Sequence, residues 1–225
     1  MNAVLVHQRL GAAITTAERR RLATLNTALI SDSLERSVGA IGIDPVCEED
    51  SGLMAGTALT VRTRPGDNLA VHVALDRIRP GDVVVIDGRG EVTNALLGEL
   101  MVSYARTRGV VGIVVDGAVR DVAQLRRGPV PVYARGRTHQ GPYKSGPGAV
   151  HGAISVGGIA VHDGDVVVGD SDGVAFIPRT RLASTLLAAE AKLRAEEQEL
   201  VQIQAGNWDR PWIAHAEIQP LPAAQ

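Results

Sequence analysis

The sequence is poor in aromatic residues and contains one cysteine. Its 225 residues include one Phe, two Trp and three Tyr, so little material exists for stacking bases on an aromatic platform, the usual way of binding single-stranded nucleic acid. Cys47 is the only cysteine, which excludes an internal disulfide and a cysteine-based zinc site and fits a reducing compartment. With no evident His partner, Cys47 is expected to be structural or incidental.

The sequence also lacks a charge excess and a long apolar run. The formal net charge is -2, without the clustered Lys and Arg that a polyphosphate partner such as nucleic acid requires. No apolar run approaches the roughly 18 residues that span a bilayer, and the N-terminus has no basic segment followed by an apolar one. We therefore expect a cytoplasmic protein with no nucleic-acid partner and no membrane partner.

The composition that is present is that of one globular domain. Hydrophobic residues make up 45% of the chain and charged residues 21%, and this length suffices for one substantial core. We expect a single domain over residues 1–225, in which residues 1–14 form an N-terminal arm, loose or docked. Residues 204–225, with Trp208 and Trp212, are expected to form a C-terminal tail that wraps a neighbouring subunit.

Apolar patterning predicts an α/β fold with a mixed sheet. The runs DVVVID at 82–87 and GVVGIVVD at 109–116 are typical of buried strands, and a helical stretch at 99–108 separates them, which makes a parallel βαβ unit. Later strands are separated by Gly-Gly and Asp-Gly pairs, which favour antiparallel turns. Further strands are expected at 53–63 (alternating, hence half-buried), 131–134, 150–156, 159–161, 165–168 and 174–177, and further helices at 15–25, 27–34 and 67–78.

A long C-terminal helix is expected to close the fold. One seam runs along it, stepping by four and three residues, through Leu182, Leu186, Ala189, Leu193, Glu196, Leu200 and Ile203. Glu196 interrupts this seam. Either the register drifts and leaves Glu196 on a solvated edge, or the helix packs on another subunit and Glu196 reaches a polar site there.

The chemistry is predicted to lie where two strands end. Gly98 and Glu99 open the helix after one buried strand, and Arg120 and Asp121 follow the next. In open α/β sheets, ligands bind in the crevice outside the carboxyl ends of the strands. We therefore expect the two clusters to meet there, although Arg-Asp after a strand also occurs in surface turns and Glu at a helix start also compensates the helix dipole.

The residue types at this site suit a 2-oxo acid. A helix that begins at Gly98 would point the N–H groups of Leu100 and Met101 outward toward a carboxylate, and Arg120 would add a planar fork of donors. Asp121 and Glu99 supply the hard oxygen ligands that Mg²⁺ or Mn²⁺ prefers. The pattern therefore predicts anion donors, a guanidinium and a carboxylate-bound divalent metal cation in one site.

Other polar residues give weaker signals. Lys144, in the Gly- and Pro-rich stretch 138–148, and Arg135 are either solvated surface charges or partners for the distal carboxylate of a dicarboxylic substrate. Asp170 and Asp172 lack the rest of an EF-hand pattern and are expected in a hairpin turn. The histidines lack ligand spacing such as HExxH, and no GxSxG, P-loop or dinucleotide-binding GxGxxG is present.

The segment GELMVSYARTRGVVGIVVDGAVRD resembles the signature of the RraA-like family, which includes 4-hydroxy-4-methyl-2-oxoglutarate aldolases and the RNase E regulator RraA. The segments RPGDVVVID, PVYARG, GPYKSGPG and GDVVVGDSDGVAFIP agree with it and occur in family order. The resemblance covers roughly residues 25–200. It implies a swivelling βα fold assembled as a homotrimer or homohexamer, with active sites between subunits.

The resemblance also assigns roles. It implies that Asp121 binds the metal, that Glu99 holds a metal-bound water, and that Arg120 contacts the keto acid. The family commonly has Asp where this chain has Glu99, so the longer side chain either ligates the metal directly or displaces a water. A glutamate from a neighbouring subunit completes the site in relatives, and Glu196 is the candidate here, followed by Glu197.

Two functions of different classes follow. The first is a metal-dependent pyruvate aldolase that cleaves 4-hydroxy-2-oxo acids such as 4-hydroxy-4-methyl-2-oxoglutarate through a metal-stabilised enolate, with oxaloacetate decarboxylase activity. In this mechanism Arg120 stabilises the developing oxyanion, and a metal-bound or carboxylate-held water takes the hydroxyl proton. The second is a non-catalytic regulator that binds an RNA-degradation complex. The presence of Glu99, Arg120 and Asp121 favours the enzyme.

Overall fold

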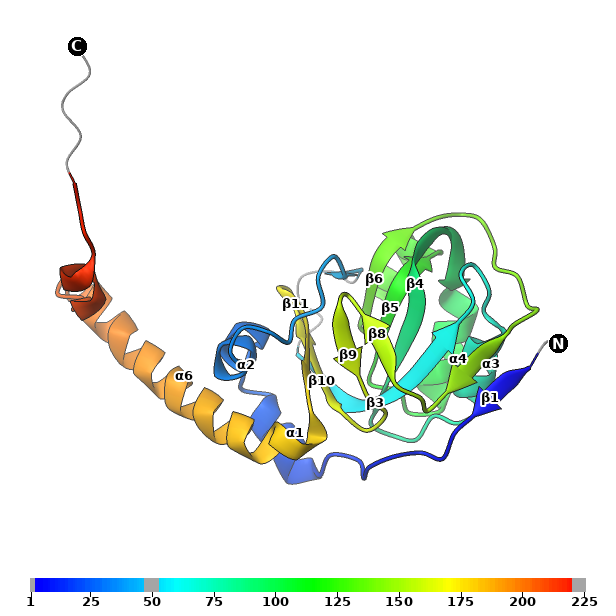
Figure 1. Ribbon diagram of the computed structural model, residues 1–225, viewed down its shortest axis with the longest axis horizontal. Coiled ribbons are helices and arrows are strands. Elements are labelled where there is room, and N and C mark those ends of the chain that lie inside the picture. The colour runs from blue at the N-terminus through cyan, green and yellow to red at the C-terminus, as the bar shows by residue number, and fades with distance from the viewer. Residues whose placement is uncertain (1–2, 47–52, 220–225) are drawn as a thin grey trace, which may run out of the picture.

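The computed structural model describes residues 3–46 and 53–219; Cys47 lies outside them. Figure 1 shows the arrangement of the elements. The helices are α1 (Thr16–Leu22), α2 (Thr27–Ser33), α3 (Leu69–Leu75), α4 (Glu99–Thr107), α5 (Val122–Arg127) and α6 (Leu182–Gln204), with short 3₁₀ turns at Arg179–Arg181 and Pro211–His215. The strands are β1 (Val4–Val6), β2 (Asp44–Pro45), β3 (Met54–Thr63), β4 (Asp82–Leu97), β5 (Gly112–Val119), β6 (Val132–Arg137), β7 (Gly148–Val150), β8 (Ile154–Val156), β9 (Ile159–Val161), β10 (Val166–Asp170) and β11 (Gly173–Ile177).

Most strands of the described residues form one mixed sheet, as the sequence predicts. Its path is β1-β7-β3-β4-β5-β6-β2, with β10 and β11 joined to it through β3. The neighbours β3, β4, β5 and β6 are parallel, whereas β7 and β10 run antiparallel to β3. The βαβ unit and the antiparallel second half are therefore confirmed.

The sheet is covered on both faces. Alternate residues of the central strands face opposite sides: Val84 and Ile86 pack with α3, α4 and α5, whereas Val83 and Val85 pack with the β8–β9 hairpin. A third apolar cluster joins α1, α2 and α6 to β10 and β11. This arrangement overturns the expectation that residues 53–63 form a half-buried strand, because every residue of β3 except Arg62 is buried.

Several element boundaries differ from the sequence-based expectation. The expected strand at 150–156 is two strands, β7 and β8, separated at His151 and Gly152. Strand β4 continues ten residues past the expected end at Asp87, with register shifts against β5, and the short helix α5 was not expected. The hairpin expected at Asp170 and Asp172 is confirmed as the β10–β11 turn.

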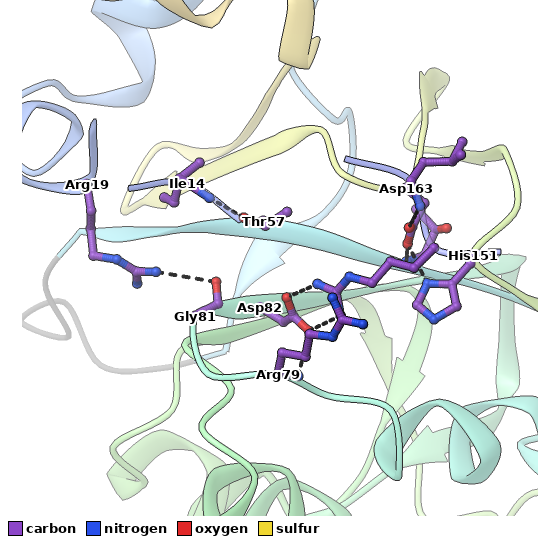
Figure 2. Close-up of polar contacts among 11 residues, drawn as sticks. Ile14, Arg19, Thr57, Arg79, Gly81, Asp82, His151 and Asp163 are labelled. Atoms are coloured by element: carbon purple, nitrogen blue, oxygen red, sulfur yellow. Dashed lines mark hydrogen bonds and ion pairs between the residues drawn. The ribbon is translucent and has the colours of Figure 1, made fainter. Parts of the chain in front are cut away.

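The N-terminal arm is docked. Strand β1 pairs in parallel with β7 at the sheet edge, and the Arg9 guanidinium forms an ion pair with the buried Asp82 carboxylate. Further along, the Ile14 N–H donates to Thr57 Oγ1 at 3.0 Å and Arg19 donates to the Gly81 carbonyl at 3.5 Å (Figure 2). Residues 9–19 are thus tied to the main sheet by polar contacts.

Helix α6 confirms the expected C-terminal helix and projects from the body of the molecule (Figure 1). Its first half buries Leu182, Leu186 and Ala189 against α2, whereas Leu200 and Ile203 in the distal half are exposed. Beyond it, the Trp208 and Trp212 rings pack edge to face, with centroids 6.1 Å apart. In the described ranges, no helix has the length and apolar content that crossing a membrane demands.

Candidate active site

The two predicted clusters meet at the ends of β4 and β5. Leu97 and Val119 are paired in register as the last residues of the two strands. The Arg120 N–H then donates to the Leu97 carbonyl at 3.0 Å, and the Glu99 N–H donates to Asp121 Oδ2 at 3.0 Å. Carboxyl ends of neighbouring parallel strands therefore bring these residues together, as the sequence predicts.

Asp121 occupies an unusual backbone conformation at the start of α5. Its φ of 58° lies in the left-handed region, which Asp and Asn tolerate better than most side chains. Its Oδ2 also lies 3.8 Å from Arg120 Nε, and both side chains are partly open to solvent. The turn thus aims the Asp121 carboxylate at the start of α4 and brings the Arg120 guanidinium close to Gly141 of the loop 138–148.

The start of α4 differs from the expectation in one respect. The Met101 N–H donates to the Gly98 carbonyl at 3.1 Å and so is not directed outward. The anion nearest this helix end is the chain's own Asp121, held by the Glu99 N–H. Leu100, which is 81% exposed, lies at the rim.

Gly98 is required by the close approach of the Arg120–Asp121 turn. A Cβ at position 98 would lie 2.3 Å from Asp121 Oδ2 and 2.9 Å from Arg120 Cγ, so Gly98→Ala must displace the carboxylate. The backbone itself, with φ of -150°, suits any residue. We expect turnover by this site to fall about 100-fold, the cost of a misplacement of about 1 Å, with the fold intact by circular dichroism.

The matched control for this substitution is Gly39→Ala, because the nearest atom to a Cβ at position 39 is 3.9 Å away. This variant should keep full turnover. If Gly98→Ala also kept full turnover, the close approach of Asp121 would be irrelevant to the chemistry.

Gly98, Arg120 and Asp121 line a cleft of about 310 Å³. This volume is at the lower end of the range for small-molecule sites. Its walls come from α3, the end of β4, the start of α4, the Arg120–Asp121 turn and the loop 138–148. The lining residues are Asn68, His72, Ala95, Leu97, Gly98, Leu100, Met101, Arg120, Asp121, Gly141, Pro142 and Lys144. Of the two expected candidates for a distal carboxylate, Lys144 lies in this cleft.

The loop 138–148 is fixed to the body of the protein. The fully buried Asp67 accepts from the N–H groups of Ser145 at 2.6 Å and Gly146 at 2.9 Å through Oδ2. Its Oδ1 accepts from the Leu69 N–H at 2.9 Å, as expected of a residue that opens α3. One buried carboxylate thus joins the loop that carries Lys144 to the start of α3.

Asn68 is a cleft residue that the sequence did not reveal. It is 2% exposed, and its Nδ2 donates to the Leu96 carbonyl at 3.0 Å. Within the described ranges, its Oδ1 is the one buried side-chain nitrogen or oxygen without a hydrogen-bond partner. Buried polar groups are normally paired, so this unpaired acceptor, which is itself buried, is an exception next to the cleft. The sequence places Asn68 at the start of the helix expected at 67–78, where a polar residue is explained by helix capping alone.

His72 lies one helical turn further along α3, in the same cleft. Partial burial lowers the pKa of its imidazole, and the positive charge of Lys144 lowers it further, against a smaller opposing effect of Asp76. A pKa below the usual value near 6.5 keeps the ring neutral at pH 7. The stabilising contribution of neutral His72 is complete above the unfolded pKa and is lost as the pH falls through the folded pKa.

We expect the His72 ring proton signals to titrate by NMR with a midpoint below 6.5, the usual histidine value. Lys144→Gln should raise this midpoint, because it removes a positive charge that opposes protonation. The control is Lys192→Gln on α6, which should leave the midpoint unchanged. An unchanged midpoint in Lys144→Gln would mean that the Lys144 ammonium group is too far from His72 for both side chains to contact one small ligand.

Three of the candidate residues lie elsewhere in the single chain. Glu99 lines a neighbouring groove of about 520 Å³ between α4 and α5. Arg135 is committed to the buried Asp116, with Nε 2.5 Å from Oδ1. Glu196 lies on the projecting part of α6, remote from α4 (Figure 1), and its nearest ion-pair partner is Lys192 at 3.7 Å.

The cleft suits a hard metal cation that binds one protein carboxylate and takes its remaining ligands from water and substrate. Across the described residues, no group of three His, Cys, Asp or Glu side chains could enclose a metal. The cleft offers the Asp121 carboxylate, whose Oδ2 takes the Glu99 N–H. Mg²⁺ typically binds one or two carboxylates and completes its octahedron with water and substrate oxygens, whereas structural zinc sites need four protein ligands. The residues therefore fit Mg²⁺ or Mn²⁺.

Comparisons with known proteins agree with this fold. Residues 27–176 match the RraA-like family model, described as Aldolase/RraA. The chain is 39% identical over 175 residues to a protein of Halalkalibacterium halodurans provisionally named a 4-hydroxy-4-methyl-2-oxoglutarate aldolase, covering 77% of this chain and 82% of that one. The crystal structure of Streptomyces coelicolor RraAS2, described as an unusual member of the RNase ES inhibitor RraA family, superposes with a TM-score of 0.77. It is 25% identical and covers 84% of this chain and 98% of its own.

The structure of RraA from Thermus thermophilus, described as an RNA-processing inhibitor, is also similar. It is 31% identical, with a TM-score of 0.61, and the alignment covers 68% of this chain and 92% of that one. The matched range includes both strand ends and the loop that form the cleft.

Proposed function

The chain belongs to the RraA-like family, and from this premise we propose that it is a divalent-metal-dependent lyase. The proposed reaction cleaves 4-hydroxy-2-oxo acids such as 4-hydroxy-4-methyl-2-oxoglutarate to pyruvate, with decarboxylation of oxaloacetate as a second activity. The observation that carries the proposal is the cleft in which Arg120, Asp121 and Lys144 converge at the start of α4. Arg120 and Lys144 can bind the two carboxylates of such a substrate, and Asp121 can hold a cation at its keto oxygen.

Each residue has a proposed task in that reaction. Asp121 would hold Mg²⁺ or Mn²⁺, and the bound cation would supply Lewis acidity toward the 2-oxo acid. Glu99 would serve as the second acidic residue once its side chain turns from the α4–α5 groove toward Asp121. Arg120 binds the oxyanion that develops as the bond between carbons 3 and 4 breaks. Lys144 pairs with the distal carboxylate. A carboxylate-held water takes the 4-hydroxyl proton, and the electron pair of the broken bond passes to the enolate of pyruvate, which is then protonated at carbon 3.

Asn68 is a further cleft residue with a free acceptor. Among the described residues its Oδ1 has no partner, and this atom is buried behind the cleft surface. A substrate hydroxyl can therefore pair with it only after the Asn68 side chain turns toward the cleft, and the gain from pairing a buried acceptor favours such a turn.

We further propose that the functional form is a homotrimer or homohexamer and that Glu196, or the adjacent Glu197, completes the site of a neighbouring subunit. Within one chain the distal part of α6, which includes Glu196, projects away from α3 and α4 (Figure 1). It exposes Leu200 and Ile203, which are three residues apart and share one side of the helix, an apolar face that suits burial against another subunit.

The test is pyruvate release from 4-hydroxy-4-methyl-2-oxoglutarate and from oxaloacetate, with Mg²⁺, with Mn²⁺ and with EDTA. Metal-dependent turnover of the hydroxylated substrate, abolished by EDTA, is the expected result. If correctly folded protein turned over neither compound with either metal, the lyase proposal would be wrong.

The second candidate is a non-catalytic regulator of an RNA-degrading enzyme. The observation in its favour is the similarity to one structure described as an RNA-processing inhibitor and to another described as an unusual member of the RNase ES inhibitor RraA family. A protein that only docks on a partner has no need of a carboxylate and a guanidinium in a cleft. The two candidates are distinguished by the turnover measurement and by inhibition of RNase E cleavage in the absence of any 2-oxo acid.

A further inference from the structure

A further hollow lies apart from both the cleft and the α4–α5 groove, at the edge of the sheet where β1 meets β7. It has a volume of about 520 Å³, which is within the usual range for small-molecule sites. Its lining residues are Ala3, Leu5, Arg62, Thr63, Arg64, Pro65, Arg89, Pro147 and Gly148. We call this hollow the arginine groove. It shares no lining residue with the active-site cleft.

All charged residues that line the arginine groove are positive. Arg62 and Arg64 are two positions apart around the end of β3, and Arg89 comes from the outward part of β4. Arg62 on β3 is paired in register with Asp87 on β4. Arg64 and Arg89 each follow two residues later, so they lie at the same end of this strand pair. By contrast, the cleft and the α4–α5 groove contain the acidic residues Asp121 and Glu99.

The three guanidinium groups have no acidic partner in the part of the chain that the structure describes. None of them forms an ion pair with an acidic residue of the described ranges. The nearest carboxylate along the strands, Asp87, is buried, and its oxygens accept from the N–H groups of Arg89 at 3.0 Å and Ser155 at 3.4 Å. Three like charges around one hollow repel each other unless an anion binds there.

The backbone at Arg89 forms a tight turn within β4. The φ values of 58° at Arg89 and 70° at Gly90 are both in the left-handed region, as in a type I′ turn, and the Asp87 carboxylate braces the turn through the Arg89 N–H. This turn fixes the backbone position of the residue that supplies the third guanidinium.

We propose that the arginine groove binds a small ligand that carries a chain of phosphoryl groups. Each guanidinium offers a planar fork of donors that matches two oxygens of one phosphoryl group, and three forks suit successive groups of a chain. The apolar side chains of Leu5, Pro65 and Pro147 line the remaining wall and can contact an uncharged part of the ligand. The net charge of -2 argues against an extended nucleic-acid surface but not against a local site made by three arginines.

The test is isothermal titration calorimetry of the full chain with tripolyphosphate and, separately, with ATP. EDTA is present so that metal complexes of the ligands do not form, and no 2-oxo acid is added. We expect saturable binding that weakens as salt is raised. Arg62→Gln, Arg64→Gln and Arg89→Gln should each weaken it by about tenfold or more, the usual effect of losing a charge-assisted hydrogen bond.

The matched control is Arg20→Gln, because Arg20 is also exposed but lies on α1, outside the arginine groove. It should bind as the unaltered chain does, and unchanged thermal midpoints should verify that all four variants fold. Tighter binding of ATP than of tripolyphosphate identifies an organic ligand as the source of the phosphoryl chain, and equal binding identifies an inorganic one; both support the site.

Two results would overturn the proposal. One is the absence of saturable binding of either compound at concentrations up to about 1 mM, the limit of weak affinity. The other is an equal loss of binding in Arg20→Gln and in the groove variants, which would indicate a general charge effect. Because no turnover is measured, neither result bears on the lyase proposal.

Discussion

Asp121→Asn is expected to lower the rate of pyruvate release by about 10²–10³-fold, the range found when one charge-stabilising group is removed from an active site. Asp121 is the acidic residue that lines the cleft and the proposed ligand of the divalent cation. An amide oxygen is a weaker ligand for a hard cation than a carboxylate. Raising the Mg²⁺ concentration should therefore restore part of the activity, which steady-state assays over a metal series will measure.

The asparagine variant separates charge from structure. Asn tolerates the left-handed φ of 58°, and its Oδ1 can still accept from the Glu99 N–H. The thermal midpoint should be unchanged, and Asp172→Asn in the β10–β11 turn is a control that should keep full activity. Unimpaired pyruvate release by Asp121→Asn would exclude a role for this carboxylate in metal binding.

Arg9→Met is expected to lower the free energy of unfolding by about 3–5 kcal/mol, the usual cost of leaving one partner of a buried ion pair unpaired. The Asp82 side chain is 0% exposed and that of Arg9 is 11% exposed. Asp82 Oδ2 also accepts from the Arg79 N–H at 2.8 Å, so this carboxylate joins the N-terminal arm to the turn before β4. Urea unfolding of both proteins measures the difference.

The double variant Arg9→Met/Asp82→Asn tests whether the unpaired charge causes the loss. Asn has no charge to bury and can keep the acceptor for the Arg79 N–H. The double variant should therefore be more stable than Arg9→Met alone. If it were less stable by the sum of the two single losses, the ion pair would not be the reason for the cost.

The central part of the fold was predictable from the sequence because its signals are local. Long runs of Val and Ile at 82–87 and 109–116 have no polar face, so they indicate strands buried on both sides. The run that includes Met54 alternates, yet it is also buried on both sides, because α3 covers Leu59 and Val61 on one face and the β8–β9 hairpin packs with Ala58 on the other. The β8–β9 hairpin lies about a hundred residues further along the chain, so no local pattern contains this burial.

The site was predictable to the extent that it depends on strand order. Residues that follow neighbouring parallel strands must meet, and this places Glu99 next to Asp121. Asn68, His72 and Lys144 could not be assigned in this way, since they reach the cleft through the loop contacts of Asp67. The separation of Glu99 from the cleft depends on a side-chain direction that spacing does not determine.

Because the loop 138–148 is attached to Asp67, it becomes ordered when the protein folds and not when a ligand binds. Ordering a flexible segment costs about 1–2 kcal/mol of conformational entropy per residue, and a mobile loop would incur this cost at each binding event. Here the buried carboxylate fixes Ser145 and Gly146 as the chain folds. A ligand therefore meets a receptor whose shape already exists, so its association rate should be limited by diffusion and orientation and not by loop closure.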